Sequence, residues 1–143
     1  MPTRGITPSM KKFKIAILAV AALSVAGPAA ASVTPHAQSS LVLSVTVGTA
    51  APNGPRPTPK VVTLRCDRDS GSHPTPRAAC DLLRKVNGNA ANLNVDPGGI
   101  CTREYIPHTA RLLGKWRGRP VSFEKTFGNR CEMIKTTGAV FTF

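Results

Sequence analysis

The chain has 143 residues, of which 41% are apolar, and it carries 19 Lys and Arg against seven Asp and Glu. This length and composition are typical of one domain with a modest core. The positive residues are spread along the chain, and five Phe, one Tyr and one Trp offer few rings for stacking on bases. Nucleic acid is therefore not an expected partner.

The first residues have the pattern of an export signal. Residues 1–14 carry four basic and no acidic side chains, residues 15–25 are almost wholly apolar, and Ala29-Ala30-Ala31 offers a small-x-small cleavage site. The apolar run is too short to span a bilayer comfortably. We interpret residues 1–31 as a signal peptide and residues 32–143 as one secreted, extracellular domain, with a buried N-terminal helix as the alternative. That domain has 15 basic and seven acidic residues, a formal charge of +8, and no membrane partner is expected after cleavage.

The first half of the expected domain alternates between strand patterns and turn residues. Residues 40–47 and 60–66 are rich in Leu and Val and are predicted to be strands. Between them, residues 50–59 hold four prolines and an Asn-Gly pair, so we expect a loop. Pro76 is well placed for the first turn of a helix whose apolar residues recur up to Val86, and Asn87-Gly88 is expected to end that helix.

The second half begins with a long irregular stretch. Residues 89–107 lack periodicity, and residues 96–99 (DPGG) are a strong turn signal. Residues 109–116 and 119–127 are predicted to form a hairpin around Arg117-Gly118, and residues 138–143 (GAVFTF) a final short strand. Strands outnumber helices, so the predicted class is α+β with an antiparallel sheet.

Four cysteines lie in the expected exported part: Cys66, Cys80, Cys101 and Cys131. An even number in a small exported domain indicates two disulfides, and the sequence alone allows three pairings. If neighbours pair, loop entropy contributes about 3 and about 3.7 kcal/mol. The spacings form no C-x-x-C zinc or redox motif, so we expect neither a metal nor a cofactor.

Residues suited to catalysis are sparse. His36, His73 and His108 stand beside or near prolines in expected loops, and none of the familiar hydrolase, zinc, phosphate-loop or dinucleotide motifs is present. We therefore expect a binding protein rather than an enzyme, although a spatial triad leaves no sequence signature.

One segment of the irregular stretch stands out as a candidate binding loop. Residues 99–107 (GICTREYIP) run from a glycine pair to a proline with a cysteine between them, a pattern that favours an extended but anchored backbone. A long basic residue, Arg103, follows two places after the cysteine and is expected to project outwards. On these local features alone, an exposed loop with an incidental arginine is at least an equal interpretation.

The chain resembles the Streptomyces subtilisin inhibitor family along nearly the whole expected domain. The matching motifs, which occur in the same order, are SLVL (40–43), VVTLRC (61–66), GSHP (71–74), AACDL (78–82), Cys101, GKWRGRPVSFE (114–124), FGNRCEM (127–133) and AVFTF (139–143). Residues up to 37 and the loop at 50–59 contribute little to the resemblance.

The resemblance implies a fold and a mode of action. It implies a five-stranded antiparallel sheet with two short helices, a homodimer formed through the sheets, and the disulfides Cys66–Cys80 and Cys101–Cys131. It also implies inhibition of serine endopeptidases of the subtilisin and trypsin types, with Arg103–Glu104 as the inhibitory reactive bond and Arg103 at P1. The implied contacts with the protease come from Gly99, Ile100 (P4), Cys101 (P3), Thr102 (P2), Tyr105 (P2′) and Ile106 (P3′), and Asn129 is the implied support of the loop.

The sequence departs from the best-known family pattern at the implied reactive bond. Arg103 stands where a large apolar P1 residue is usual, which shifts the expected specificity towards trypsin-like enzymes. Glu104 places a negative charge at P1′. A cationic secreted binding or antimicrobial protein is the rival interpretation, in which the +8 charge and the cluster Lys115, Arg117 and Arg119 would be the active features.

Overall fold

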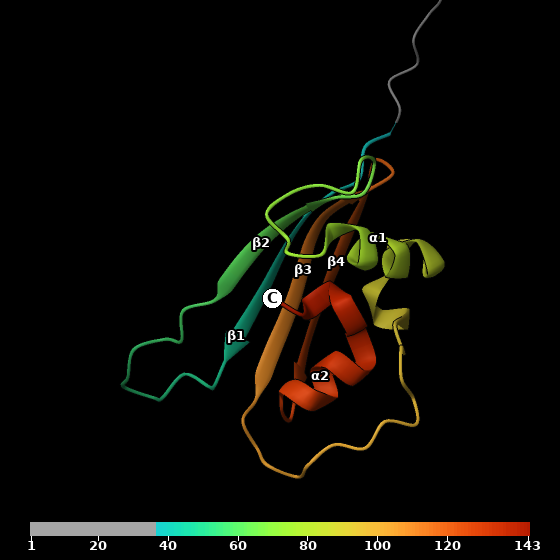
Figure 1. Cartoon of the computed structure of the whole chain (residues 1–143). Coiled ribbons are helices and arrows are strands. Elements are labelled where there is room, and N and C mark those ends of the chain that lie inside the picture. Colours follow the sequence, from blue (N-terminus) through green and yellow to red (C-terminus); the bar gives the residue numbers. More distant parts are fainter. Residues whose placement is uncertain (1–36) are drawn as a thin grey trace, which may run out of the picture. The chain divides into compact units, whose positions relative to one another are not determined.

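The computed structural model describes residues 37–143, and the expected signal peptide and its cleavage site lie outside these residues. Four strands form one antiparallel sheet in the order β2-β1-β3-β4 (Figure 1). The strands are β1 (Ser40–Val47), β2 (Lys60–Arg65), β3 (His108–Trp116) and β4 (Arg119–Phe127). The four predicted strands before residue 128 are thus confirmed to within one residue at each end.

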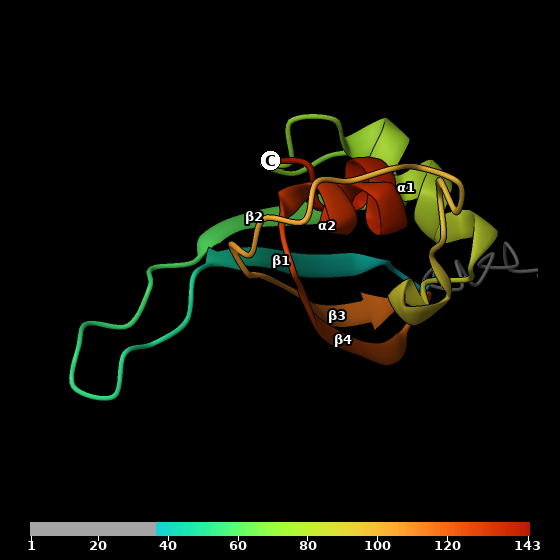
Figure 2. The ribbon, with the colours of Figure 1, turned by 90° about the horizontal axis from the view of Figure 1, so that it is seen from below.

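Within the described residues, the two α-helices, α1 (Pro76–Lys85) and α2 (Arg130–Thr137), lie on the same face of the sheet (Figure 2). Strand β1 shows why: its side chains alternate, so that Leu41 and Leu43 are buried under the helices while Val42, between them, is 48% exposed on the other face. Leu83 of α1 and Met133 of α2 complete the core from the helix side, each with no exposed surface. Burial of these apolar groups is the main force that holds the two layers together.

The β3–β4 hairpin turns at Arg117-Gly118, as predicted. Both residues have positive φ, 47° for Arg117 and 79° for Gly118, which is the backbone of the two-residue turn that best matches strand twist. Ser39 Oγ accepts a hydrogen bond of 3.0 Å from Arg117 N, which ties this turn to the start of β1.

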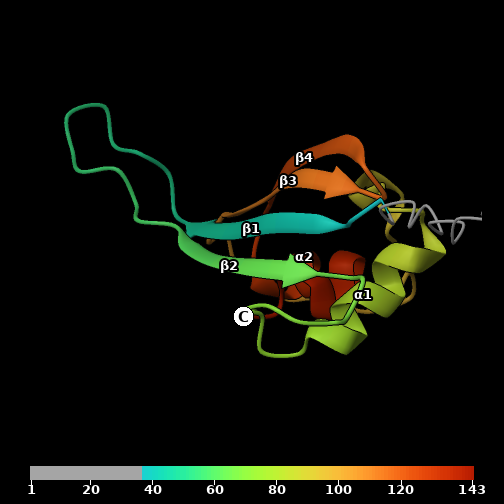
Figure 3. The same ribbon diagram turned by 90° about the horizontal axis from the view of Figure 1, so that it is seen from above.

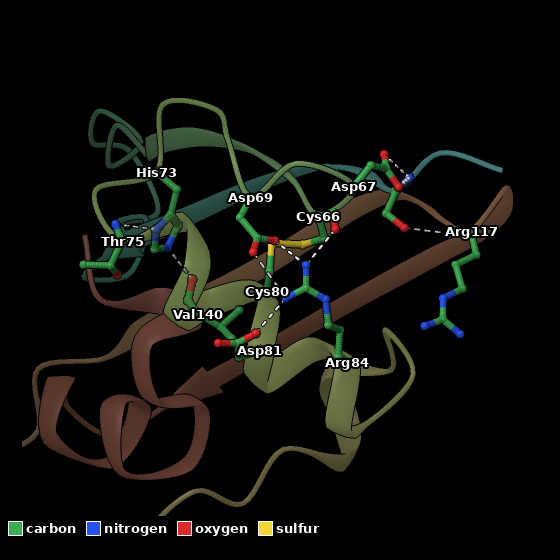
Figure 4. Close-up of a disulfide and its surroundings, with 11 residues drawn as sticks. Cys66, Asp67, Asp69, His73, Thr75, Cys80, Asp81, Arg84, Arg117 and Val140 are labelled. Atoms are coloured by element: carbon green, nitrogen blue, oxygen red, sulfur yellow. Dashed lines mark hydrogen bonds and ion pairs between the residues drawn. A yellow bond between two sulfur atoms is a disulfide. The ribbon is translucent and has the colours of Figure 1, made fainter. Parts of the chain in front are cut away.

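The disulfide Cys66–Cys80 joins the end of β2 to α1, with a Cα–Cα distance of 5.3 Å (Figure 4). Beside it, the Arg84 guanidinium donates to Asp81 at 2.6 Å and to the Cys66 carbonyl at 2.8 Å, and it also pairs with Asp69. The hydrogen bonds that Arg84 donates to these carboxylates, the one to Asp69 first, hold the pKa of Arg84 above its ordinary value. The crosslink and this charge cluster fix the loop between β2 and α1.

The prediction of a fifth strand is wrong. Residues 138–143 do not join the sheet, because Gly138–Phe141 form a 3-10 turn that follows α2 directly. Gly138 has φ of 57°, a conformation that ends α2 and turns the chain back. Val140 and Phe141 are adjacent and both fully buried, whereas neighbouring residues of a strand point to opposite faces. The apolar residues of this segment therefore pack a helical turn against the core and do not form a strand.

Among residues 37–143, no helix is long and apolar enough to cross a bilayer.

The β1–β2 connection, residues 48–59, is a long loop that runs beyond the ends of both strands (Figure 3). Its four prolines and its turn residues explain why the ladder between β1 and β2 stops at the pair Val45 and Lys60.

Candidate functional site

The candidate segment, residues 99–106, is extended, and all of its residues except the half-buried Gly99 and Cys101 are exposed. Residues 101–107 have no helical or strand assignment, and they lead directly into β3 at the end of the sheet shown at the foot of Figure 1. Ile100 is 96% exposed and Tyr105 is 75% exposed. Since exposed large side chains that gather on one segment often mark a contact surface, this part of the chain is suited to contact another molecule.

The disulfide Cys101–Cys131 anchors this segment from within. The Cα–Cα distance is 5.7 Å, and Cys131 lies in the first turn of α2. Both disulfides therefore have the pairing that the resemblance implied, and within the described residues no cysteine is free. The crosslink fixes the backbone two residues before Arg103 to a helix that is packed against the core.

The side chain of Asn129 is a second anchor, and its amide oxygen and amide nitrogen have different hydrogen-bond partners. It is the N-cap of α2, where its Oδ1 accepts a hydrogen bond of 2.9 Å from Glu132 N. Its Nδ2 donates to the carbonyls of Thr102 at 3.0 Å and Glu104 at 3.1 Å. Asn129 is only 2% exposed. The backbone is thus held on both sides of Arg103 by a group whose own position is set by a helix.

The ends of the segment are held by contacts that the sequence did not indicate. Lys135 Nζ donates to the Gly99 carbonyl at 3.0 Å, and Ile106 N donates to the Gly128 carbonyl at 2.9 Å. His108 Nδ1 lies 2.7 Å from the Ile106 carbonyl. Lys135 and Gly99 lie 36 residues apart in sequence, so only the folded chain brings them together.

The side chains at the implied reactive bond face solvent. Arg103 and Glu104 are both exposed. Thr102 Oγ1 donates to Glu104 Oε1 at 3.4 Å, a long contact across the bond. Among residues 37–143, no ion pair involves the Arg103 guanidinium. A carboxylate of another molecule can therefore pair with Arg103 without breaking an ion pair among the described residues.

A cavity among the described residues lies away from the candidate segment. It measures about 680 Å³ and is lined by residues near the start of β1 and the β3–β4 turn, including Ser39, Asp67 and Trp116. The Asp67 carboxylate there already accepts hydrogen bonds of 3.1 and 2.9 Å from Ser39 N. Within residues 37–143, no group of three or more His, Cys, Asp or Glu could hold a metal ion.

Comparison with known proteins identifies the family. The family model described as subtilisin inhibitor-like matches residues 37–129. The chain is 41% identical over 111 residues to subtilisin inhibitor-like protein 1 of Streptomyces cacaoi, covering 76% of this chain and 98% of that protein. It is 44% identical over 111 residues to protease inhibitor SIL-V5 of Streptomyces luteoverticillatus, covering 76% of this chain and all of that protein.

A solved structure agrees with these relatives. Sermetstatin of Streptomyces caespitosus, crystallised in complex with Bacillus licheniformis subtilisin, is 32% identical to this chain with a TM-score of 0.57. The match covers 74% of this chain and 99% of sermetstatin. Family members are protease inhibitors, not enzymes. The chain belongs to the subtilisin inhibitor-like family.

Proposed function

We propose that this chain is an exported inhibitor of serine endopeptidases that binds its target as a substrate would, with Arg103 at P1. The reactive bond of this proposal is Arg103–Glu104. The observation that carries it is the backbone of residues 99–106, which is extended, largely exposed and fixed on both sides of Arg103 by Asn129. A segment of this shape can enter a protease cleft without further folding.

Preorganisation is the source of the proposed affinity. A nanomolar complex requires about −12 kcal/mol, and an interface of roughly 1,600 Å² reaches that value only when little ordering remains to be done on binding. The disulfide Cys101–Cys131 and the hydrogen bonds of Asn129 order the segment before it meets the protease. Most of the conformational entropy is therefore already lost in the free inhibitor.

Arg103 supplies the proposed specificity. Its guanidinium can form charge-assisted hydrogen bonds with a carboxylate at the base of a trypsin-like S1 pocket. In a subtilisin-like enzyme, the arginine stem and the exposed Ile100 at P4 can still fill apolar subsites. We therefore expect inhibition of both protease types, with Thr102 at P2, Glu104 at P1′, Tyr105 at P2′ and Ile106 at P3′.

Slow turnover follows from where the two new ends would lie after cleavage. The end at Arg103 is held through Cys101–Cys131, and the carbonyl of Glu104 on the other side is held by Asn129. Both ends thus remain against α2, at a high effective concentration relative to each other. Religation of the bond then competes with release, and the complex is long-lived.

Export and dimerisation are further parts of the proposal. Cleavage after residue 31 would release the domain 32–143 outside the cell. The sheet face opposite the helices carries Val42, Val61 and Leu113, which are 48%, 53% and 42% exposed. Two copies that pair through this face would bury those side chains, as the family resemblance implies, and sedimentation at micromolar concentration tests for the dimer.

The test of the proposed function is a pair of inhibition constants, for trypsin and for subtilisin, measured on the parent domain and on Arg103→Met. Methionine keeps a long apolar side chain but removes the cation. Trypsin loses a buried charge pair, so its inhibition constant should rise by roughly 30-fold to 5,000-fold. Subtilisin should bind the variant at least as well as the parent.

Arg77→Met is the matched control, because Arg77 is an exposed arginine of α1 outside the proposed contact segment. It should leave both inhibition constants unchanged. Equal losses against the two proteases for Arg103→Met, or no loss against trypsin, would show that the reactive bond lies elsewhere.

A further inference from the structure

The β1–β2 loop, residues 48–59, is longer than the fold requires. Antiparallel neighbours such as β1 and β2 can be joined by a two-residue turn, as β3 and β4 are at Arg117-Gly118. Residues 49–59 are exposed except for Pro57, which is half-buried. Within the described residues, the loop's backbone makes one hydrogen bond to itself, from Gly54 N to the Ala51 carbonyl at 3.2 Å. A long exposed loop without a role in the core is a candidate for function.

The base of this loop is joined to the end of the candidate segment. Val47, the last residue of β1, pairs with His108, the first residue of β3. The next residue, Gly48, donates from its N–H to the Pro107 carbonyl at 2.8 Å. Pro107 directly follows Ile106, the proposed P3′ residue. The loop and the segment therefore leave the sheet at the same end (Figure 1), with the loop on the primed side of the proposed reactive bond.

The loop also has the composition of a contact surface that is partly ordered in advance. Pro55, Pro57 and Pro59 alternate with other residues, and each fixes its own φ and restricts the residue before it. Arg56 is the loop's exposed cation, and no acidic residue occurs between residues 37 and 66. Such a loop favours a partner surface that is acidic and partly apolar, at a low entropic cost of ordering.

The size of a stable interface favours the protease itself as that partner. Standard interfaces use about 20–30 residues on each side, which is more than residues 99–106 provide. The adjoining surface on the primed side is the β1–β2 loop. We propose that residues 48–59 form a second contact area, which touches the target serine protease beyond its primed subsites at the same time as the reactive segment fills the cleft. This inference rests on the proposed function and adds a second determinant of specificity to it.

The experiment uses the domain 32–143 and a variant in which residues 50–57 are replaced by Asn-Gly. The variant keeps Gly48 and every residue of β1 and β2, so the pairing with β3 and the hydrogen bond to Pro107 are retained. The inhibition constant for subtilisin should rise about tenfold or more, equivalent to about 1.4 kcal/mol. The midpoint of thermal unfolding should stay at the parent value, because the deleted residues lie outside the core.

Charge and exchange measurements complete the test. Arg56→Glu should slow association with subtilisin about threefold to tenfold at low salt, whereas Arg77→Glu on α1, with the same change in net charge, should not. Amide hydrogens of residues 49–58 should exchange more slowly in the subtilisin complex than in the free domain.

The outcomes separate this inference from the proposed function. If the parent inhibits subtilisin and the shortened variant inhibits it equally, with unchanged amide exchange, the second contact area is refuted and the reactive segment stands. If the loop is instead protected in the free domain at high concentration, its partner is a second copy and the inference is again refuted. If the parent inhibits neither trypsin nor subtilisin, the proposed function itself is refuted.

Discussion

The two disulfides of the described domain are the same chemical bond in opposite surroundings. Cys66–Cys80 lies inside the fold, where Cys66 is 7% exposed and Cys80 has no exposed surface, and it joins β2 to α1. Cys101–Cys131 lies at the surface, where Cys131 is exposed, and it joins the extended segment to α2. The first crosslink is surrounded by the core, and the second stands two residues from Arg103.

This difference in surroundings indicates a division of labour that loop length does not reveal. The sequence separations are 14 and 30 residues, so loop entropy assigns about 3 kcal/mol to the buried crosslink and about 3.7 kcal/mol to the exposed one. By that measure the exposed bond stabilises the fold more. We infer from the contacts that the buried bond serves mainly the fold, whereas the exposed bond also serves inhibition, and this contrast can be broken one bond at a time.

The largest expected effect is on folding, from Cys66→Ala combined with Cys80→Ala. Both sulfurs lie in the core, so their loss should lower the free energy of unfolding by about 2–5 kcal/mol. Urea unfolding measures this loss. Well below the unfolding midpoint, the inhibition constant for subtilisin should stay within about threefold of the parent, because the sites are separate. A folded variant that loses inhibition would contradict the division of labour.

Cys101→Ser combined with Cys131→Ser should act on inhibition as well as on stability. The folded variant should become a substrate that is cut after Arg103, since the cleaved end is no longer tied to α2. The lifetime of the inhibited complex should shorten about hundredfold or more. Progress curves with excess variant show this as recovery of protease activity. Inhibition that is as tight and durable as the parent's would refute the bracing role of this disulfide.

Asn129→Ser should give a smaller effect of the same kind. A serine can still cap α2 by accepting from Glu132 N, but it cannot donate to the carbonyls of Thr102 and Glu104. The segment then has more freedom before it binds, which predicts about a tenfold rise in the inhibition constant, and the two lost hydrogen bonds should lower the free energy of unfolding by about 1–3 kcal/mol. Asn129→Ala should add about 1 kcal/mol of destabilisation by removing the cap. Equal inhibition constants for Asn129→Ser and the parent would remove Asn129 from the mechanism.

The smallest effect should come from acid, and it should act on the region of the buried disulfide. His73 lies in the loop that Cys66–Cys80 closes and is buried there; its Nδ1 accepts from Thr75 N at 3.1 Å and its Nε2 lies 3.2 Å from the Val140 carbonyl (Figure 4). Burial lowers the pKa of His73 below its ordinary 6.5, because the charged form is poorly solvated there.

The sign of the acid effect follows from that lowered pKa. The unfolded chain binds a proton at His73 at a higher pH than the folded chain does. The stabilisation is therefore complete above pH 6.5 and is lost as the pH falls from 6.5 through the lower pKa of the folded state. His73→Gln, which keeps a donor for the Val140 carbonyl, should flatten this part of the stability profile measured by urea unfolding. An unchanged slope in the variant would assign the acid effect to other groups.

The sheet up to residue 127 could be predicted because its signals are local. Leu41, Leu43 and Val45 alternate with more exposed residues, and the prolines of the β1–β2 loop stop the pairing at a readable place. The prediction of a strand at residues 138–143 was wrong because the contacts that decide its structure are not local. Its apolar alternation resembles that of a strand, but Gly138 ends α2 and directs the chain into a 3-10 turn. Packing of Val140 and Phe141 in the core favours this turn.

The candidate site was predicted unevenly. The position of Arg103 and Glu104 came from the family resemblance, since the local features alone favoured an incidental arginine equally. The contacts of Lys135 with Gly99 and of His108 with Ile106 were not predicted, because a bond to a backbone carbonyl leaves no residue pattern. The junction between Gly48 and Pro107 depends in the same way on strand register.

The bond between Arg103 and Glu104 can be examined directly by incubating the domain 32–143 with a catalytic amount of subtilisin and following its mass. We predict that the first product is heavier by one water and stays in one piece until the disulfides are reduced. Reduction should then release one fragment that ends at Arg103 and one that begins at Glu104. A first cut at any other bond, for example within residues 49–59, would contradict the assignment of the reactive bond and the mechanism built on it.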